Sequence, residues 1–147
     1  MQFIISALSG PDYPEVIFVW EASVRASHHF LAEADIQYYK PVIVTDYLPV
    51  LDLFGIRHAS GGLAGFIGIA GRKIEMLFVH PDDFGKGIGK ALCQYAVREL
   101  RASEVDVNED NPGACQFYTK MGFEVTGRSP VDPGGKPFPI LHLAMKA

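Results

Sequence analysis

A crossover unit in the middle of the chain restricts the fold more than any other feature. Residues 73–79 form an apolar run, a glycine-rich loop follows, and from Ile88 onward apolar residues recur at helical spacing. Residues 103–108 then alternate in the manner of a strand. Because strand–helix–strand connections join parallel strands, we expect an α/β fold in which 73–79 and 103–108 are parallel neighbours.

The sequence before this unit predicts an antiparallel meander. Glycine and proline separate the segments as turn residues do. The expected strands of this half are residues 2–8, 53–58, 63–70 and 73–79. Helices are expected at 14–29 and 33–52, and the second should be kinked or split because Pro41 and Pro49 interrupt it.

The strand at 73–79 is apolar on both faces, so we expect it to be central and covered on both sides. Regular alternation predicts two sets of side chains. One face would carry Ile74, Met76 and Phe78, and the other Glu75, Leu77 and Val79.

A second helix signal begins at Asn111 and Pro112, which suit the N-cap and the first helical position. Its apolar stripe and the glycine that ends it place the helix at about 112–121. Two strands follow, at about 123–130 and 138–145. The expected whole is a mixed sheet with an antiparallel first half and one parallel crossover.

Composition excludes several classes of protein. The chain has 147 residues, of which 48% are hydrophobic, and a net charge of −4, so we expect a single domain over 1–147 and no nucleic-acid footprint. Two cysteines do not make a disulfide scaffold. No apolar run approaches the roughly 18 residues of a membrane span, and the first residues lack the basic region of a signal peptide. These observations favour a soluble, cytoplasmic protein without a membrane partner.

The glycine-rich loop has the features of an anion site. Gly85, Gly87 and Gly89 lead directly into a helix N-terminus, where unpaired N–H groups and the helix dipole favour phosphate. Lys86 and Lys90 add positive charge. The loop is not a Walker loop, and it fits a dinucleotide fingerprint poorly because three antiparallel strands precede it. A simple turn is the alternative.

Two motifs in this half of the chain resemble a known family. LFVHP at 77–81, followed by FGKGIG at 84–89, resembles the acetyl-CoA motif of the GNAT superfamily of N-acetyltransferases. NEDN at 108–111 and FYTKMGF at 117–123 resemble its downstream motif, and the segment 127–139 is similar to the small bacterial YjaB-type branch. The resemblance implies a GNAT-like mixed, mostly antiparallel sheet with the parallel crossover at the acetyl-CoA site and about four helices.

The resemblance also implies a reaction. Acetyl-CoA would be the co-substrate, and its acetyl group would pass directly to an amine of a small molecule, peptide or protein through a tetrahedral intermediate. The backbone of Leu77, Phe78 and Val79 would hold the pantetheine arm and polarise the thioester carbonyl. The remaining implied cofactor contacts are Phe84, Gly85, Lys86, Gly87, Ile88, Gly89, Lys90 and Asn111. Phe84 stands where the family usually has Arg or Gln, so the diphosphate would depend on backbone amides and the lysines.

Two residues are candidates for proton transfer. Tyr118 matches the family's general acid, and a phenol with an ordinary pKa near ~10 is protonated at neutral pH; the alternative is a core aromatic on the helix stripe. Glu75 is the candidate base, because an acid on a central strand needs a solvated cleft or a partner; the alternative is an acid at a strand end in solvent.

The acceptor side is less defined by sequence. His28, His29 and Tyr47 are candidates for lining the acceptor pocket, and surface or capping roles are the alternative. The N-cap role of Asn111 already explains that residue. The five histidines show no metal-ligand spacing, and the chain could be a monomer or a homodimer. A CoA-binding or regulatory module without turnover, and a nucleotide-binding protein, are the competing functions.

Overall fold

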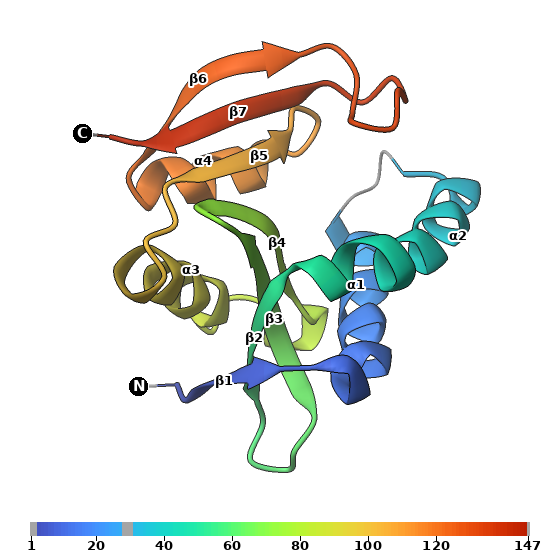
Figure 1. Cartoon of the computed structure of the whole chain (residues 1–147), viewed down its shortest axis with the longest axis vertical. Helices are drawn as coiled ribbons and strands as arrows, with labels where there is room; N and C mark the ends of the chain where they lie inside the picture. Colours follow the sequence, from blue (N-terminus) through green and yellow to red (C-terminus); the bar gives the residue numbers. More distant parts are fainter. Residues whose placement is uncertain (1–2, 28–30, 147) are drawn as a thin grey trace.

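A seven-stranded sheet runs through the computed structural model, which describes residues 3–27 and 31–146 (Figure 1). The strand order is β1-β2-β3-β4-β5-β7-β6. The strands are β1 (Ile5–Leu8), β2 (Asp52–Arg57), β3 (Leu63–Ala70), β4 (Lys73–Val79), β5 (Glu104–Asn108), β6 (Phe123–Ser129) and β7 (Ile140–Met145). The α-helices of the described ranges are α1 (Tyr13–Ser27), α2 (Glu33–Val42), α3 (Ile88–Glu99) and α4 (Pro112–Lys120).

The pairing confirms the predicted topology. β1 to β4 form an antiparallel meander, and β5, β7 and β6 form a second antiparallel set. β4 and β5 are parallel and pair only at Lys73↔Glu104 and Ile74↔Val105. The two halves of the sheet therefore separate beyond Ile74, and Figure 1 shows β5, β7 and β6 as an upper layer above the meander.

Two predicted elements differ in extent. The first strand is shorter than 2–8, since pairing with β2 begins at Ile5. The helical segment 33–52 is divided: α2 contains Pro41 and ends at Val42, a π turn covers Ile43–Tyr47, and a 3-10 turn covers Leu48–Val50. Proline removes one backbone donor and crowds the preceding turn, which explains why the regular helix does not continue.

The predicted alternation of β4 is wrong at Glu75. In the register with β3, Gly68 pairs with Met76 and Ile69 with Ile74, so Glu75 is the extra residue of a β-bulge. Ile74 consequently packs in the cluster on the α3 side, whereas Met76 packs in the cluster on the α1 side. Glu75 borders a cavity beside Met76 and Phe78, and it also lines a narrow space next to β5 together with Leu77.

Helices cover both faces of the meander (Figure 1). α1 and α2 enclose one hydrophobic cluster around Trp20 and Phe66, and α3 and α4 enclose the other around Leu92 and Phe123. β4 contributes to both clusters, as its apolar composition predicted. Within residues 3–27 and 31–146, no helix is long and apolar enough to cross a membrane.

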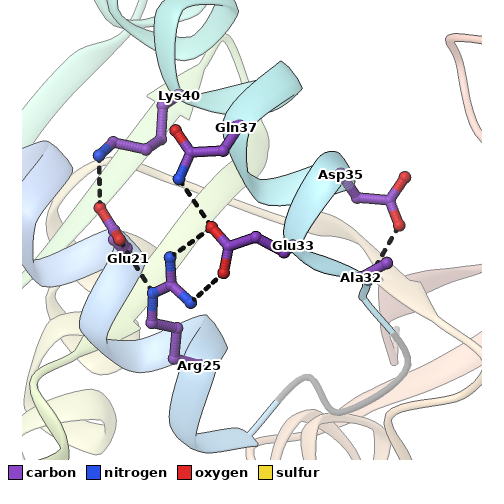
Figure 2. A network of polar contacts seen from close by, with 7 residues as sticks. All are labelled: Glu21, Arg25, Ala32, Glu33, Asp35, Gln37 and Lys40. Carbon is purple, nitrogen blue, oxygen red and sulfur yellow. Dashed lines mark hydrogen bonds and ion pairs between the residues drawn. The ribbon is translucent and has the colours of Figure 1, made fainter.

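A polar network joins α1 to α2 (Figure 2). The Arg25 guanidinium binds both carboxylate oxygens of Glu33 at 2.8 and 2.9 Å, and its Nε lies 2.9 Å from Glu21. Lys40 Nζ lies 2.6 Å from the other oxygen of Glu21, and Gln37 donates to Glu33 at 2.8 Å. A bidentate arginine–carboxylate pair fixes orientation as well as distance. The network therefore sets the angle at which α2 meets α1.

This network makes stability depend on pH in acid. The hydrogen bond from Arg25 lowers the pKa of Glu33 to about 2, against an ordinary value near ~4.3. A depressed pKa contributes stability that is present above about pH 4.3 and is lost as the pH falls towards about 2. We expect Glu33→Gln to lower the thermal midpoint near neutral pH, and the gap from the native chain to close in acid. Thermal melts from neutral pH down to about pH 2 test this prediction. A difference in thermal midpoint that stays constant with pH would contradict the role of Glu33. Glu124→Gln on the exposed face of β6 is the control.

Candidate functional site

The glycine-rich loop connects β4 to α3 through a tight turn. His80 Nδ1 accepts a hydrogen bond of 3.1 Å from the backbone N–H of Asp82, and this capping bond begins a 3-10 turn at Pro81–Asp83. Gly85 and Gly87 have φ of +78° and +84°, a region that side chains disfavour. Gly87 is the N-cap of α3. The loop thus places the N-terminus of α3, which is the positive end of the helix dipole, next to the C-terminal end of β4.

A cleft of about 540 Å³ lies between this loop, β4 and α4. Ten of the predicted cofactor residues border it: Leu77, Phe78, Val79, Phe84, Gly85, Gly87, Ile88, Gly89, Lys90 and Asn111. Lys86 is not among the lining residues, and its Nζ lies 3.0 Å from Oδ1 of Asp83, which does line the cleft. The lining also contains residues that were not predicted as cofactor contacts, namely Ser23, Ser27, Asp83, Gly113, Ala114 and Phe117.

The separation of β4 from β5 opens a slot of about 110 Å³ next to this cleft. The parallel pairing of β4 with β5 covers Lys73 and Ile74 and stops there. Leu77 and Phe78 line both the slot and the cleft. A strand edge inside a cleft offers N–H and C=O groups to an extended ligand.

Tyr118 lies where the cleft and the slot meet, since it lines both. Its side chain is 7% exposed and contacts Phe117 and Phe123 edge-on, with ring centroids 5.0 and 5.6 Å away. Burial, with a smaller contribution from Cys93, raises the pKa of the phenol far above its ordinary value. The hydroxyl is therefore protonated at neutral pH and is available as a donor.

Asn111 occupies the predicted N-cap of α4. Its Oδ1 accepts a hydrogen bond of 3.1 Å from the backbone N–H of Ala114, and Pro112 is at the first helical position. Asn111 also lines both the cleft and the slot. The capping role is confirmed, and it holds the start of α4, and with it Tyr118, against the cleft.

Glu75 is part of a chain of polar groups that crosses the sheet. Lys73 Nζ lies 3.4 Å from Glu75 Oε1 and 2.7 Å from Asp106 Oδ2. Asp106 Oδ1 lies 2.7 Å from His142 Nδ1, and His142 Nε2 lies 2.7 Å from Ser129 Oγ. Burial opposes ionisation of Asp106, but the hydrogen bonds with Lys73 and His142 outweigh it and lower the pKa of the carboxyl. The chain fixes the ammonium of Lys73 beside Glu75.

A second cavity, of about 290 Å³, lies on the α1–α2 side of β4. Glu75, Phe78 and Tyr47, a predicted acceptor residue, are among its lining residues. The other lining residues are Trp20, Val24, Leu31, Tyr39, Ile43, Met76, Asn108, Asp132, Phe138 and Ile140. Phe78 borders both this cavity and the large cleft. His28 and His29, the other predicted acceptor residues, lie outside the described residues.

The loop between β6 and β7 borders this cavity and binds α2. Asp132 Oδ2 accepts a hydrogen bond of 2.7 Å from the hydroxyl of Tyr39. Lys136 Nζ lies 3.1 Å from Asp35 Oδ1 and 4.7 Å from the centroid of the Tyr38 ring. An ammonium that has both a carboxylate and an aromatic face as partners is held by charge and by cation–π attraction. These pairs join segments about a hundred residues apart, so no local pattern could have indicated them.

Comparison with known proteins agrees with this geometry. Residues 52–142 match the acetyltransferase (GNAT) domain family. The chain is 40% identical over 132 residues to the peptidyl-lysine N-acetyltransferase YjaB of Salmonella typhimurium, with 88% of each chain covered. The chain belongs to the GNAT family of N-acetyltransferases. It is an enzyme that transfers the acetyl group of acetyl-CoA to an amine acceptor.

Other relatives extend the comparison. The peptidyl-lysine N-acetyltransferase YiaC of Escherichia coli is 29% identical over 115 residues, with 78% of each chain covered. The solution structure of apo-form YjaB from Escherichia coli has a TM-score of 0.88 at 34% identity, covering 98% of this chain and 97% of that one. The PaiA N-acetyltransferase of Thermoplasma acidophilum in complex with coenzyme A has a TM-score of 0.75 at 23% identity, with full coverage of both chains, which shows that the fold is shared.

The cleft of this GNAT enzyme suits coenzyme A. A Cβ at Gly85 or Gly87 would meet nothing within 4 Å, so the loop leaves open space next to the helix N-terminus. The apolar wall of Leu77, Val79 and Phe117 suits the pantetheine arm. Phe84 is 47% exposed at the edge of the cleft, and a phenyl ring brings no charge to the diphosphate. Backbone amides, the helix dipole and Lys90 remain as the attractive groups there.

The left-handed conformation of Gly87 leads to a prediction about cofactor affinity. An alanine at φ +84° is strained by roughly 1 kcal/mol or more, and a loop that relaxes will misplace the amides of the helix N-terminus. We expect Gly87→Ala to raise the Kd for acetyl-CoA about fivefold or more, measured by isothermal titration calorimetry. Gly71→Ala is the matched control, since Gly71 has φ +61° in the distant β3–β4 turn. Equal effects of the two substitutions on Kd would contradict the role of Gly87.

Proposed function

We propose that this chain acetylates the side-chain amine of lysine in peptides or proteins, by direct transfer from acetyl-CoA. The names of the YjaB and YiaC relatives support this acceptor class. The observation that carries the proposal is the cavity on the α1–α2 side of β4, which meets the cofactor cleft at Phe78. Aromatic and aliphatic side chains line it, and Glu75 and Asp132 are its carboxylates.

The chemistry of this cavity suits a lysine side chain. A lysine presents four methylene groups and a terminal ammonium, so it needs an apolar passage that ends at an acid. Trp20, Tyr39 and Phe138 supply apolar surface, and Glu75 lies on the strand that also borders the cleft. The chain already holds one lysine in a comparable way, since Lys136 binds Asp35 and the ring of Tyr38.

Glu75 acts as the general base in this proposal. A lysine amine has an ordinary pKa near ~10.4 and must lose a proton before it attacks. Glu75 lines both the acceptor cavity and the slot, so it can reach the amine itself or a water molecule beside it. Its bulged position turns it towards the acceptor side. The ammonium of Lys73 at 3.4 Å compensates its negative charge before the reaction.

Tyr118 acts as the acid in this proposal. The thioester supplies an activated acetyl group, and its departing sulfur needs a donor. The phenol remains neutral because burial raises its pKa. Thiols, with an ordinary pKa near ~8.5, are stronger acids than such a phenol, so Tyr118 stabilises the departing sulfur chiefly by donating a hydrogen bond. The backbone of Leu77 to Val79 supplies the donors for the pantetheine arm and the carbonyl.

A panel of matched acceptors tests the acceptor class. We expect acetyl-CoA and a peptide with a blocked α-amine and a free lysine to release thiol, and the lysine to become acetylated as read by mass spectrometry. The same peptide with norleucine in place of lysine should release none. A peptide with a free α-amine and no lysine, and a polyamine, should react much more slowly. Equal or faster rates with either of the last two would contradict a lysine acceptor.

A further inference from the structure

Asp83 is a buried carboxylate in the wall of a cleft that accepts a polyanion. Its side chain is 3% exposed, and it lines the cleft next to Phe84 and Gly85. Ionised side chains are rarely buried unless they are paired. Coenzyme A carries a diphosphate, so an uncompensated carboxylate here would repel the ligand of this site. The partners of Asp83 therefore bear on cofactor binding.

Each oxygen of this carboxylate has one cationic or titratable partner. Lys86 Nζ lies 3.0 Å from Oδ1, and His58 Nε2 lies 3.0 Å from Oδ2. The side chains of Lys86 and His58 are 58% and 44% exposed. The negative charge is thus buried, while both of its partners reach solvent.

The backbone around His58 holds the imidazole at this position. His58 lies in the turn between β2 and β3, where its N–H donates to Gly62 O at 2.8 Å and its C=O accepts from Gly61 N–H at 2.9 Å. Arg57 fastens the turn to α1 through Glu15 at 2.9 Å, and it also donates to Gly61 O at 2.8 Å. A segment far from the glycine-rich loop in sequence is therefore fixed against it.

We propose that His58 is a positioning residue of the acetyl-CoA site, which acts through Asp83 and strengthens diphosphate binding when it is protonated. While His58 is neutral, the charges of Asp83 and Lys86 cancel. When His58 is protonated, the three side chains together carry a net charge of one positive unit. That charge lies beside the N-terminus of α3, where it adds to the attraction for anions. Because linkage is reciprocal, ligand binding and protonation of His58 favour each other. Affinity for a diphosphate therefore rises as the pH falls through the range in which imidazoles gain charge, about pH 8 to 5.

Most of the other charged groups around Asp83, Lys86 and His58 have partners outside this cluster. On the α1 side, Arg57 binds the carboxylates of Asp12 and Glu15. On the loop side, His80 lies 3.7 Å from Asp82 and stacks on Phe18. The remaining cation of the cleft is Lys90 on α3. Among residues 3–27 and 31–146, His80 is the other histidine next to the glycine-rich loop, so it supplies the control.

Calorimetric titration with 3′-dephospho-coenzyme A tests this proposal. The 3′-phosphate of coenzyme A takes up a proton near about pH 6, and its removal leaves a diphosphate whose charge is constant. We expect the native chain to bind this ligand roughly threefold more tightly at about pH 6 than at about pH 8. His58→Gln should abolish the difference, and His80→Gln should retain it. His58→Arg, a permanent cation, should bind with the tighter affinity at both values.

Two results of this titration would contradict a role for His58. An affinity of the native chain that does not change with pH would overturn the proposal, as would a full pH response in His58→Gln. The exposed position of His58 allows the variants to fold, and a thermal melt of each confirms it. No acceptor is present in the titration, so its result is independent of whether lysine is the acceptor.

Discussion

Tyr118→Phe is expected to lower kcat by about 10²- to 10³-fold, the range for removing one hydrogen-bond donor to charge that develops in the transition state. The substitution removes one hydroxyl and leaves the ring, so the edge-on contacts with Phe117 and Phe123 remain. The Kd for acetyl-CoA should change little, because the cleft is formed mainly by β4 and the glycine-rich loop. Steady-state kinetics with a lysine peptide and calorimetry with acetyl-CoA measure the two quantities separately.

Tyr95→Phe is the matched control for this experiment. Tyr95 is on α3, where its ring packs against Phe54 at 5.3 Å, and it does not line the cofactor cleft. Its loss of a hydroxyl should leave kcat unchanged. If Tyr118→Phe also kept its native kcat, Tyr118 would be a core aromatic and the donor to sulfur would have to be another group.

Glu75→Gln is expected to lower kcat/KM by about 10²-fold near neutral pH, at the lower end for a general base because a water molecule can partly substitute. The isosteric amide retains the bulge of β4 but cannot accept a proton. The variant should also become progressively less impaired as the pH rises, since the acceptor amine then loses its proton without help. The pH dependence of kcat/KM from about pH 6 to 10 measures both effects.

Glu99→Gln serves as the control for the base. Glu99 is at the end of α3, in a surface depression that also contains Phe3 and Tyr95, and it does not line the cavity that contains Glu75. The Glu99→Gln substitution should leave the pH dependence of kcat/KM unchanged. A Glu75→Gln enzyme whose pH profile overlays that of the native enzyme would remove Glu75 from the reaction and leave it as the partner of Lys73.

Much of the fold is encoded locally, which is why it could be predicted. The caps at Asn111 and Pro112, the glycines of the loop and the spacing of apolar residues in α3 act over a few residues each. The order β4, α3, β5 then follows from the chirality and length of crossover connections. Candidate cofactor residues could be named from sequence for the same reason, since those that border the cleft, apart from Asn111, lie in the two segments 77–79 and 84–90.

The bulge at Glu75 could not be predicted, because its cause is non-local. Alternation of apolar residues in β4 reads as a regular strand, and only the register against β3 shows that one residue is extra. The consequence for β4 is large, since Glu75 borders the cavity on the α1–α2 side and Ile74 and Met76 pack in different clusters. A pattern with a period of two residues assumes an unbroken ladder, and a bulge is a break in that ladder.

The partners of several site residues were unpredictable in the same way. Lys86 was expected at the diphosphate, but the structure pairs it with Asp83, an acid in its own loop that the motif does not single out. Tyr39 and Asp132, which line the cavity on the α1–α2 side and are hydrogen-bonded to each other, are 93 positions apart in sequence. A single sequence shows which residues can bear charge, and the tertiary fold decides which of them meet.

The most direct test of the central claim is a measurement of both products of one reaction. The native chain, acetyl-CoA and a lysine peptide with a blocked α-amine are mixed, and free thiol and ε-acetyl-lysine are quantified over time. We predict that the two products appear in equal amounts, and that double-reciprocal plots at several acceptor concentrations intersect, as direct transfer requires. Thiol release without acetyl-lysine, or parallel plots with an acetylated enzyme found by intact mass, would contradict direct transfer to lysine.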